Sequence, residues 1–183
     1  ISIINKSLEI SLEINYKEGI AVSKNILGYC FLIQGKFDEA SDLFFTSLKI
    51  FDELGEKLHI AQTNFLIGNA FFYSTDYPNS VIYFSRSLSL FNEIAILEKS
   101  KSIRYVSNIS MAANTLNLGS IYMYQGNYLK SLDYFYRSLK TFEELEIKQK
   151  IAICITNIGT VYGYQKDYVK CLDYLNRGLQ IFK

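Results

Sequence analysis

The sequence predicts an all-α fold, a right-handed superhelical solenoid of antiparallel helix pairs. Apolar residues recur at spacings of three and four on both sides of short turns, which is typical of amphipathic helices. The 183 residues include one proline, far below the usual share of about 5%, so few helix breakers are present. One pattern also occurs four times at a period typical of stacked helical units. Disorder is excluded because 49% of the residues are hydrophobic.

The repeated pattern is centred on a glycine. The four copies lie at Gly28, Gly68, Gly119 and Gly159, at separations of 40, 51 and 40 residues. Each glycine is followed by aromatic and small residues at fixed distances, and the aromatic positions are predicted to form the core: Phe31, Phe44, Phe71, Phe84, Tyr122, Phe135 and Tyr162. Glycine inside a helix costs about 1 kcal/mol relative to alanine. We therefore expect close helix approach at the glycines, with Ala40 facing Gly28 and Ser80 facing Gly68.

Each copy is predicted to be one helix pair, in a single array over 1–183. A leading half-repeat, 1–16, contains one helix, and four units follow at 17–56, 57–107, 108–147 and 148–183. The expected helices are 2–14, 18–34, 37–54, 58–74, 77–97, 104–125, 128–145, 148–165 and 168–182. Short turns separate the helices of each pair, and Asp76, Asn127 and Asp167 are expected to be N-caps.

The 51-residue spacing indicates an insertion near 95–105 in the second unit. Eleven residues make about three helical turns, so the flanking helices can lengthen without turning their apolar faces. Its basic residues Lys99, Lys101 and Arg104 have two interpretations, contact with an acidic partner or a solvated helix extension.

These residues resemble the tetratricopeptide repeat family over nearly the whole chain. The family's early tryptophan is replaced by Lys24, Asn64, Thr115 and Ile155, and its closing proline is missing. The 40-residue period is similar to the long repeats of kinesin light chain and of Rap-type bacterial regulators.

The resemblance implies that the first helices of the pairs line a concave, partner-binding wall. We expect the binding residues to be Asn25, Tyr29, Gln62, Phe65, Asn69, Tyr73, Asn117, Ser120, Tyr124, Thr156, Asn157, Thr160 and Tyr164. Lysine and arginine are absent from this set, which argues against a clamp for a peptide carboxylate. Its amides and hydroxyls can instead bond a peptide backbone.

Alternatives remain open for two groups of these residues. The asparagines either pair with a bound peptide or bond within and between helices. The tyrosines either anchor a partner through an apolar ring and polar tip or pack in the interior.

Catalysis, metals, cofactors, nucleic acid and membranes are not predicted. The net charge of +1 creates no field that attracts nucleic acid, and no apolar run reaches the roughly 20 residues of a membrane helix. His59 is the sole histidine, and Cys30, Cys154 and Cys171 have no metal-binding spacing, so they are interpreted as packing thiols. The chain is predicted not to be an enzyme.

The predicted function is a protein- or peptide-binding scaffold or sensor segment of a larger bacterial signalling protein in the cytoplasm. We expect the chain to be part of a longer polypeptide. One alternative is self-association through the solenoid ends, using Leu175, Leu179 and Phe182 or the leading half-repeat. Another is part of a Rap-like regulator of a response-regulator phosphorelay.

Overall fold

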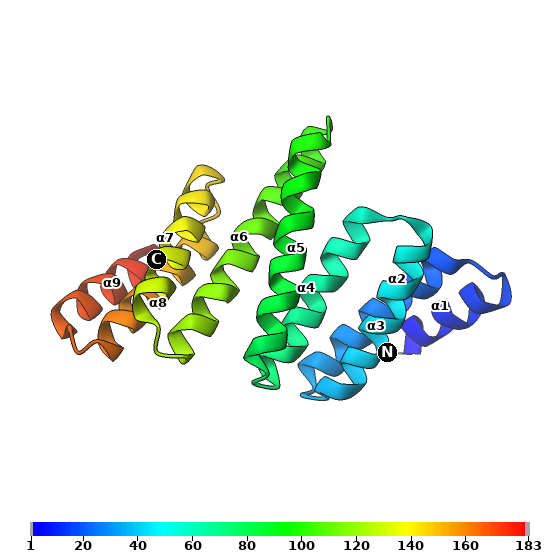
Figure 1. The fold of residues 1–183 in the computed structure, drawn as a ribbon, viewed down its shortest axis with the longest axis horizontal. Helices are drawn as coiled ribbons and strands as arrows, with labels where there is room; N and C mark the ends of the chain where they lie inside the picture. The colour runs from blue at the N-terminus through cyan, green and yellow to red at the C-terminus, as the bar shows by residue number, and fades with distance from the viewer. Residues whose placement is uncertain (1, 182–183) are drawn as a thin grey trace. The chain divides into compact units, whose positions relative to one another are not determined.

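The computed structural model describes residues 2–181, and within them the regular structure is entirely α-helical (Figure 1). The nine helices are α1 Ser2–Glu13, α2 Lys17–Ile33, α3 Phe37–Leu54, α4 Lys57–Tyr73, α5 Tyr77–Leu97, α6 Lys101–Tyr124, α7 Tyr128–Glu144, α8 Lys148–Tyr164 and α9 Tyr168–Ile181. The all-α prediction is confirmed. The largest difference between the predicted and the observed helix bounds is at α6, which begins at Lys101 rather than at residue 104.

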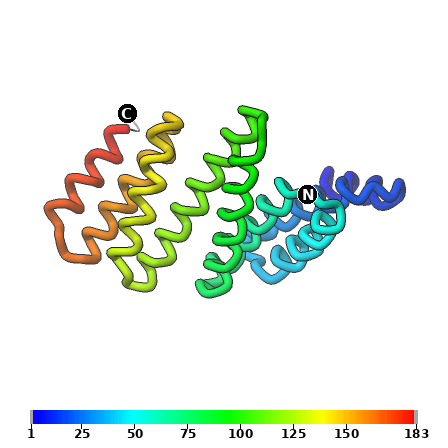
Figure 2. The backbone as a smooth tube through the Cα atoms, turned by 45° about the horizontal axis from the view of Figure 1, so that its top comes forward, coloured from blue at the N-terminus to red at the C-terminus, as the bar shows by residue number. Residues whose placement is uncertain are grey.

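The chain divides after Ile94 into two compact units. Unit 1 contains α1 to α4 and most of α5, and unit 2 contains α6 to α9. Inside each unit, consecutive helices run antiparallel and pack on one another (Figure 2). The prediction of one continuous array over 1–183, with its four repeat boundaries, stays a prediction.

Turn chemistry sets where the helices meet. Gly35 and Gly126 have φ of 75° and 76° at the ends of α2 and α6, a left-handed conformation that glycine adopts without a Cβ clash. The side chains of Asp76, Asn127 and Asp167 accept hydrogen bonds from the backbone N–H groups of Asn79, Lys130 and Lys170 at 3.1–3.2 Å. The three predicted N-caps are confirmed.

The repeated glycines allow a phenylalanine ring to lie against a helix backbone. A Cβ built on Gly28 would lie 2.7 Å from the ring of Phe44, and one on Gly119 would lie 2.7 Å from the ring of Phe135. The predicted close approach is therefore present, but the nearest group is the ring rather than the small residue. Ser80 instead donates a 2.8 Å hydrogen bond to the carbonyl oxygen of Gly68.

Phenylalanines of the second helices form the centre of each unit's core. Phe44 and Phe84 in unit 1 and Phe135 in unit 2 are fully buried, as predicted. The other predicted core aromatics are half-buried: Phe31, Phe71, Tyr122 and Tyr162. Three phenylalanines that the repeat pattern did not assign to the core are also buried: Phe51, Phe91 and Phe142.

The insertion lengthens α6 at its start. Ser100 is the N-cap of this helix, and its hydroxyl accepts from the backbone N–H of Ile103 at 3.4 Å. Lys99, Lys101 and Arg104 are exposed, which both interpretations of these residues require, contact with an acidic partner and a solvated extension.

Candidate partner-binding face

In unit 1 the predicted binding residues lie on α2 and α4, two first helices that contact each other. Tyr29 on α2 is 50% exposed, and Tyr73 at the end of α4 is 56% exposed. The ring of Tyr73 stacks on that of Phe37, with centroids 6.3 Å apart, which fixes its inner face and leaves the rest in solvent. Gln62 and Phe65 are half-buried on α4.

The asparagines of unit 1 already bond within the protein. Asn25 on α2 donates a 2.8 Å hydrogen bond to the hydroxyl of Thr63 on α4, so it ties two first helices together. Asn69 donates at 3.0 Å to the carbonyl oxygen of Phe65, one turn earlier in the same helix. For these two amides, the structure supports the interpretation of bonds within and between helices.

In unit 2 the predicted residues lie on α6 and α8, which also contact each other. Tyr124 and Tyr164 end these helices and are 55% and 53% exposed. The ring of Tyr164 is stacked on that of Tyr128 at 6.0 Å and 6°, the arrangement that Tyr73 and Phe37 make in unit 1. Asn117 and Asn157 are half-buried on the same two helices.

The hydroxyls of unit 2 on these helices donate to their own backbone. Ser120 donates to Leu116 at 3.3 Å, and Thr160 donates to Thr156 at 3.0 Å. Thr156 donates to Ala152 at 2.9 Å. Such bonds to the carbonyl one turn back remove a donor from solvent. Among the predicted binding residues on these two helices, the tyrosines are exposed and the others are half-buried.

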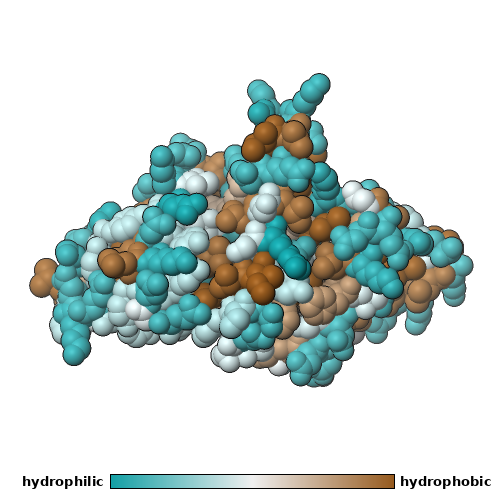
Figure 3. All heavy atoms as spheres, in the orientation of Figure 1, coloured by the Kyte–Doolittle hydropathy of each residue, from teal (hydrophilic) through white to brown (hydrophobic). Residues whose placement is uncertain are grey.

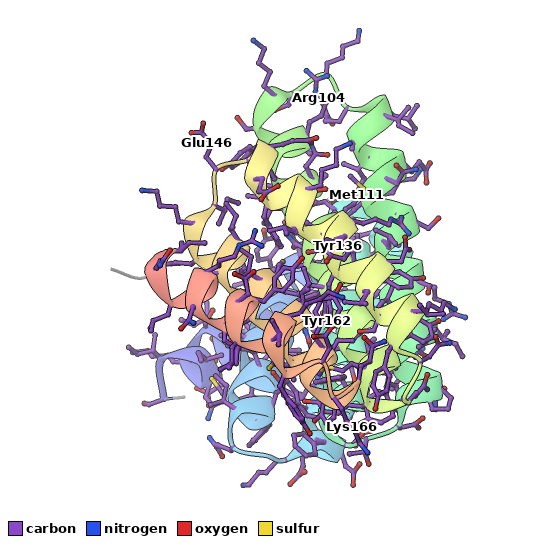
Figure 4. All side chains as sticks on the ribbon, turned by 90° about the vertical axis from the view of Figure 1, so that its left-hand side faces the viewer. Arg104, Met111, Tyr136, Glu146, Tyr162 and Lys166 are labelled. Carbon is purple, nitrogen blue, oxygen red and sulfur yellow. The ribbon has the colours of Figure 1, made fainter. Side chains whose placement is uncertain are left out.

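Sequence reasoning missed a hydroxyl cluster formed by α7, α8 and α9 of unit 2. The hydroxyl of Tyr136 on α7 lies 2.7 Å from that of Tyr174 on α9 and 3.5 Å from that of Tyr162 on α8; Figure 4 labels Tyr136 and Tyr162 side by side. Partial desolvation and these two hydroxyls raise the pKa of Tyr136 above its usual value, although the residue is 39% exposed. Phe45 has the same repeat position as Tyr136 and packs on Phe71 and Tyr83. Alignment of the second helices is therefore the only sequence signal that could have found the hydroxyl cluster.

Cys154 and His59 pack inside the protein, and Cys30 and Cys171 are half-buried. Cys154 is buried, and desolvation raises the pKa of its thiol to about 11. His59 stacks on Phe51 with ring centroids 4.6 Å apart. Residues 2–181 contain no group of three or more His, Cys, Asp or Glu side chains placed to hold a metal ion.

Hydrophobic atoms occur in small groups among hydrophilic ones on the face drawn in Figure 3. Within the described part of the chain, each helix is too short or too polar to cross a bilayer.

Comparison with known proteins identifies the repeat. Residues 111–183 match a tetratricopeptide repeat family model. No curated protein sequence matches the chain.

Solved structures extend the likeness to the rest of the chain, at sequence identities that show the fold alone. BtubC (BKLC) from P. vanneervenii is 19% identical with a TM-score of 0.74, over 90% of this chain and 64% of that one. The apo form of RapI is 20% identical with a TM-score of 0.74, over 88% of this chain and 55% of that one. The chain thus spans less than two thirds of either protein.

A third neighbour covers more of its own length. A putative kinesin light chain from Podosopora anserina with nearly identical TPR-like repeats is 12% identical with a TM-score of 0.71, over 98% of this chain and 84% of that one. Residues 111–183 therefore carry tetratricopeptide repeats, and the described chain as a whole has the fold of tetratricopeptide-type repeat proteins.

Proposed function

We propose that this chain binds a protein or peptide partner through the exposed tyrosines of its first helices. Tetratricopeptide repeats typically mediate protein–protein interaction, and their scaffold is generally non-catalytic. The observation that carries the proposal is the half-exposed state of Tyr29, Tyr73, Tyr124 and Tyr164. Tyrosine is enriched at energetically important interface positions because it offers a large apolar ring and a polar tip.

The chemistry of these helices favours an uncharged stretch of the partner. The thirteen predicted residues contain no charged side chain, and several of their donors already bond backbone carbonyls. A partner would therefore gain mainly ring contacts, with side-chain hydroxyls and amides as supplementary hydrogen-bonding groups. A clamp for a terminal carboxylate needs cations that this set lacks.

We further infer that the chain is a segment of a larger, cytoplasmic, bacterial signalling or regulatory protein. The likeness to RapI and to BtubC, each longer than the matched region, supports this inference. A Rap-like role in a phosphorelay is the more specific version of it.

Photo-crosslinking tests the proposed face. Benzoylphenylalanine placed at Tyr29 or Tyr164 should crosslink the same protein from a lysate of the source cells. The matched control is Ile82, which is 46% exposed but lies on the second helix α5. Crosslinking from Ile82 alone, or equally from all three positions, would contradict the proposal.

Self-association is a second candidate function, because α9 exposes an apolar face. Leu172 and Leu179 on this helix are exposed, and Leu175 is exposed where Phe135 in α7 is fully buried. Phe182, which the sequence analysis placed on this face, lies outside the described residues. Light scattering of the chain and of Leu179→Glu tests this function. A concentration-dependent mass that falls to the monomer value in the variant would favour it.

A further inference from the structure

Unit 1 contains a pocket away from the first-helix tyrosines. Its volume is about 350 Å³, at the lower end for small-ligand sites. It lies among α3, α4 and α5, and its polar lining is formed by Asp52, Asn64, Arg86 and Ser89. Leu48 and Leu90 contribute apolar walls.

Asn64 carries an unsatisfied acceptor at this pocket. The side chain is 4% exposed, and its Nδ2 donates to the carbonyl oxygen of Ile60 at 2.8 Å. Its Oδ1 is buried without a hydrogen-bond partner among the described residues. A buried acceptor left without a donor is unfavourable. Rotation of the amide toward an N–H group in the pocket would satisfy Oδ1 in exchange for the bond to Ile60.

Arg86 differs from its counterparts in the other repeats. Arg137 and Arg177 each lie near a carboxylate one turn earlier, Asp133 and Asp173, at 3.7 Å. The residue one turn before Arg86 is Ile82. Arg86 lies over the ring of Tyr83 at 5.3 Å but has no carboxylate within ion-pair distance in residues 2–181.

The other two polar groups are also available. Asp52 makes no ion pair with a described residue although it lines the same pocket as Arg86, so the two charges lie apart. No hydrogen bond to a described partner uses the hydroxyl of Ser89. The pocket therefore combines a cation, an anion, a hydroxyl and an amide acceptor beside apolar walls.

In α8 of unit 2 the repeat position of Asn64 is occupied by an apolar residue. Ile155 in α8 has the repeat position of Asn64, is 4% exposed and belongs to the core of unit 2. An isoleucine is thus compatible with this position, and packing alone does not require the asparagine of unit 1.

We propose that this pocket binds a small zwitterion of the amino-acid class with an apolar side chain. Arg86 and Ser89 would hold the carboxylate, since guanidinium and hydroxyl groups donate to carboxylate oxygens. Asp52 and the Oδ1 of Asn64 would accept from the ammonium group, and Leu48 and Leu90 would contact the side chain. This site is independent of the proposed partner-binding face.

The test is an NMR titration of the full 183-residue chain with L-leucine up to about 20 mM. Saturable shifts are expected at Asn64 and Ser89. Leucinamide, which lacks the carboxylate, and 4-methylpentanoate, which lacks the ammonium group, should each bind about tenfold more weakly. Absence of saturable shifts with leucine, or equal affinity for leucinamide, would overturn the proposal.

Two variants and a matched control locate the site. Arg86→Gln and Asn64→Ile should each weaken leucine binding about tenfold or more, whereas Arg177→Gln removes the equivalent cation of unit 2 and should leave it unchanged. Thermal melts by circular dichroism verify that each variant is folded. Binding that survives Arg86→Gln, or that is lost equally in Arg177→Gln, contradicts the assignment.

Discussion

The hydroxyl of Ser138 on α7 donates a 2.9 Å hydrogen bond to the carbonyl oxygen of Ala112 on α6, the first helix of the same pair. The same bond joins Ser47 to Ala21 and Ser87 to Ala61 at 2.9 Å. In the last pair the serine is replaced by Gly178, and the carbonyl of Ala152 accepts from Thr156 instead. The bond is thus a repeated connection between the two helices of a pair.

Ser138→Ala should lower the free energy of unfolding by about 1 kcal/mol, because it removes a buried hydrogen bond. Urea denaturation followed by circular dichroism measures the change. Ser85→Ala, at an exposed position of α5, is the control and should change stability by less than about 0.5 kcal/mol. Equal effects of the two substitutions would show that the Ser138 bond contributes nothing net.

Gly119→Ala should destabilise the protein by about 1–3 kcal/mol despite the better helix propensity of alanine. The new methyl group would lie 2.7 Å from the ring of Phe135, in a fully buried site where the ring has little room to move. Urea denaturation again gives the magnitude.

Gly163→Ala is the matched control for this effect. It is also a helical glycine, but an added Cβ would meet only the sulfur of Cys171, at 3.2 Å. Its stability should stay within about 0.5 kcal/mol of the parent chain. A stabilising Gly119→Ala would mean that the ring moves aside at no cost.

The sequence allowed most of the fold to be predicted because several boundaries have a local chemical signal. Gly35, Gly126 and the capping residue Asn127 mark chain reversals by their own conformational preferences. The burial of Phe51 and Phe142 was missed because the glycine-centred repeat pattern does not extend to the later half of a second helix. Their burial depends on packing against the next first helix.

The candidate site was predicted less completely, because a polar residue's partner is set by tertiary packing. The bond from Asn25 to Thr63 joins residues 38 apart, and nothing local to Asn25 signals it. The exposure of Tyr73 likewise depends on the ring of Phe37 from the preceding helix pair. The sequence identified the helices that carry these side chains but could not separate internally bonded groups from available ones.

Tyr136→Phe should cost about 1 kcal/mol of unfolding free energy, because it removes the hydroxyl shared by Tyr162 and Tyr174 while keeping the ring. Urea denaturation of the variant measures it, and Tyr105→Phe is the control at a tyrosine that is 47% exposed. The phenylalanine of unit 1 at this repeat position, Phe45, indicates that the fold accepts the change. A cost no larger than that of the control would refute a net contribution from the cluster.

Cys154 should resist thiol reagents in the folded protein. Burial raises the pKa of its thiol to about 11, so the reactive thiolate is scarce at pH 8, whereas Cys30 and Cys171 are half-buried. Brief labelling with iodoacetamide at pH 8 and peptide mass spectrometry should find Cys154 unmodified until urea is added.

Because the pKa of the Cys154 thiol is raised on folding, the associated stability is present below the unfolded value near 9 and is lost as pH rises toward 11. The unfolding free energy of the parent chain should therefore fall more steeply over that range than that of Cys154→Ala, and parallel pH profiles would show that the thiol ionises equally in both states.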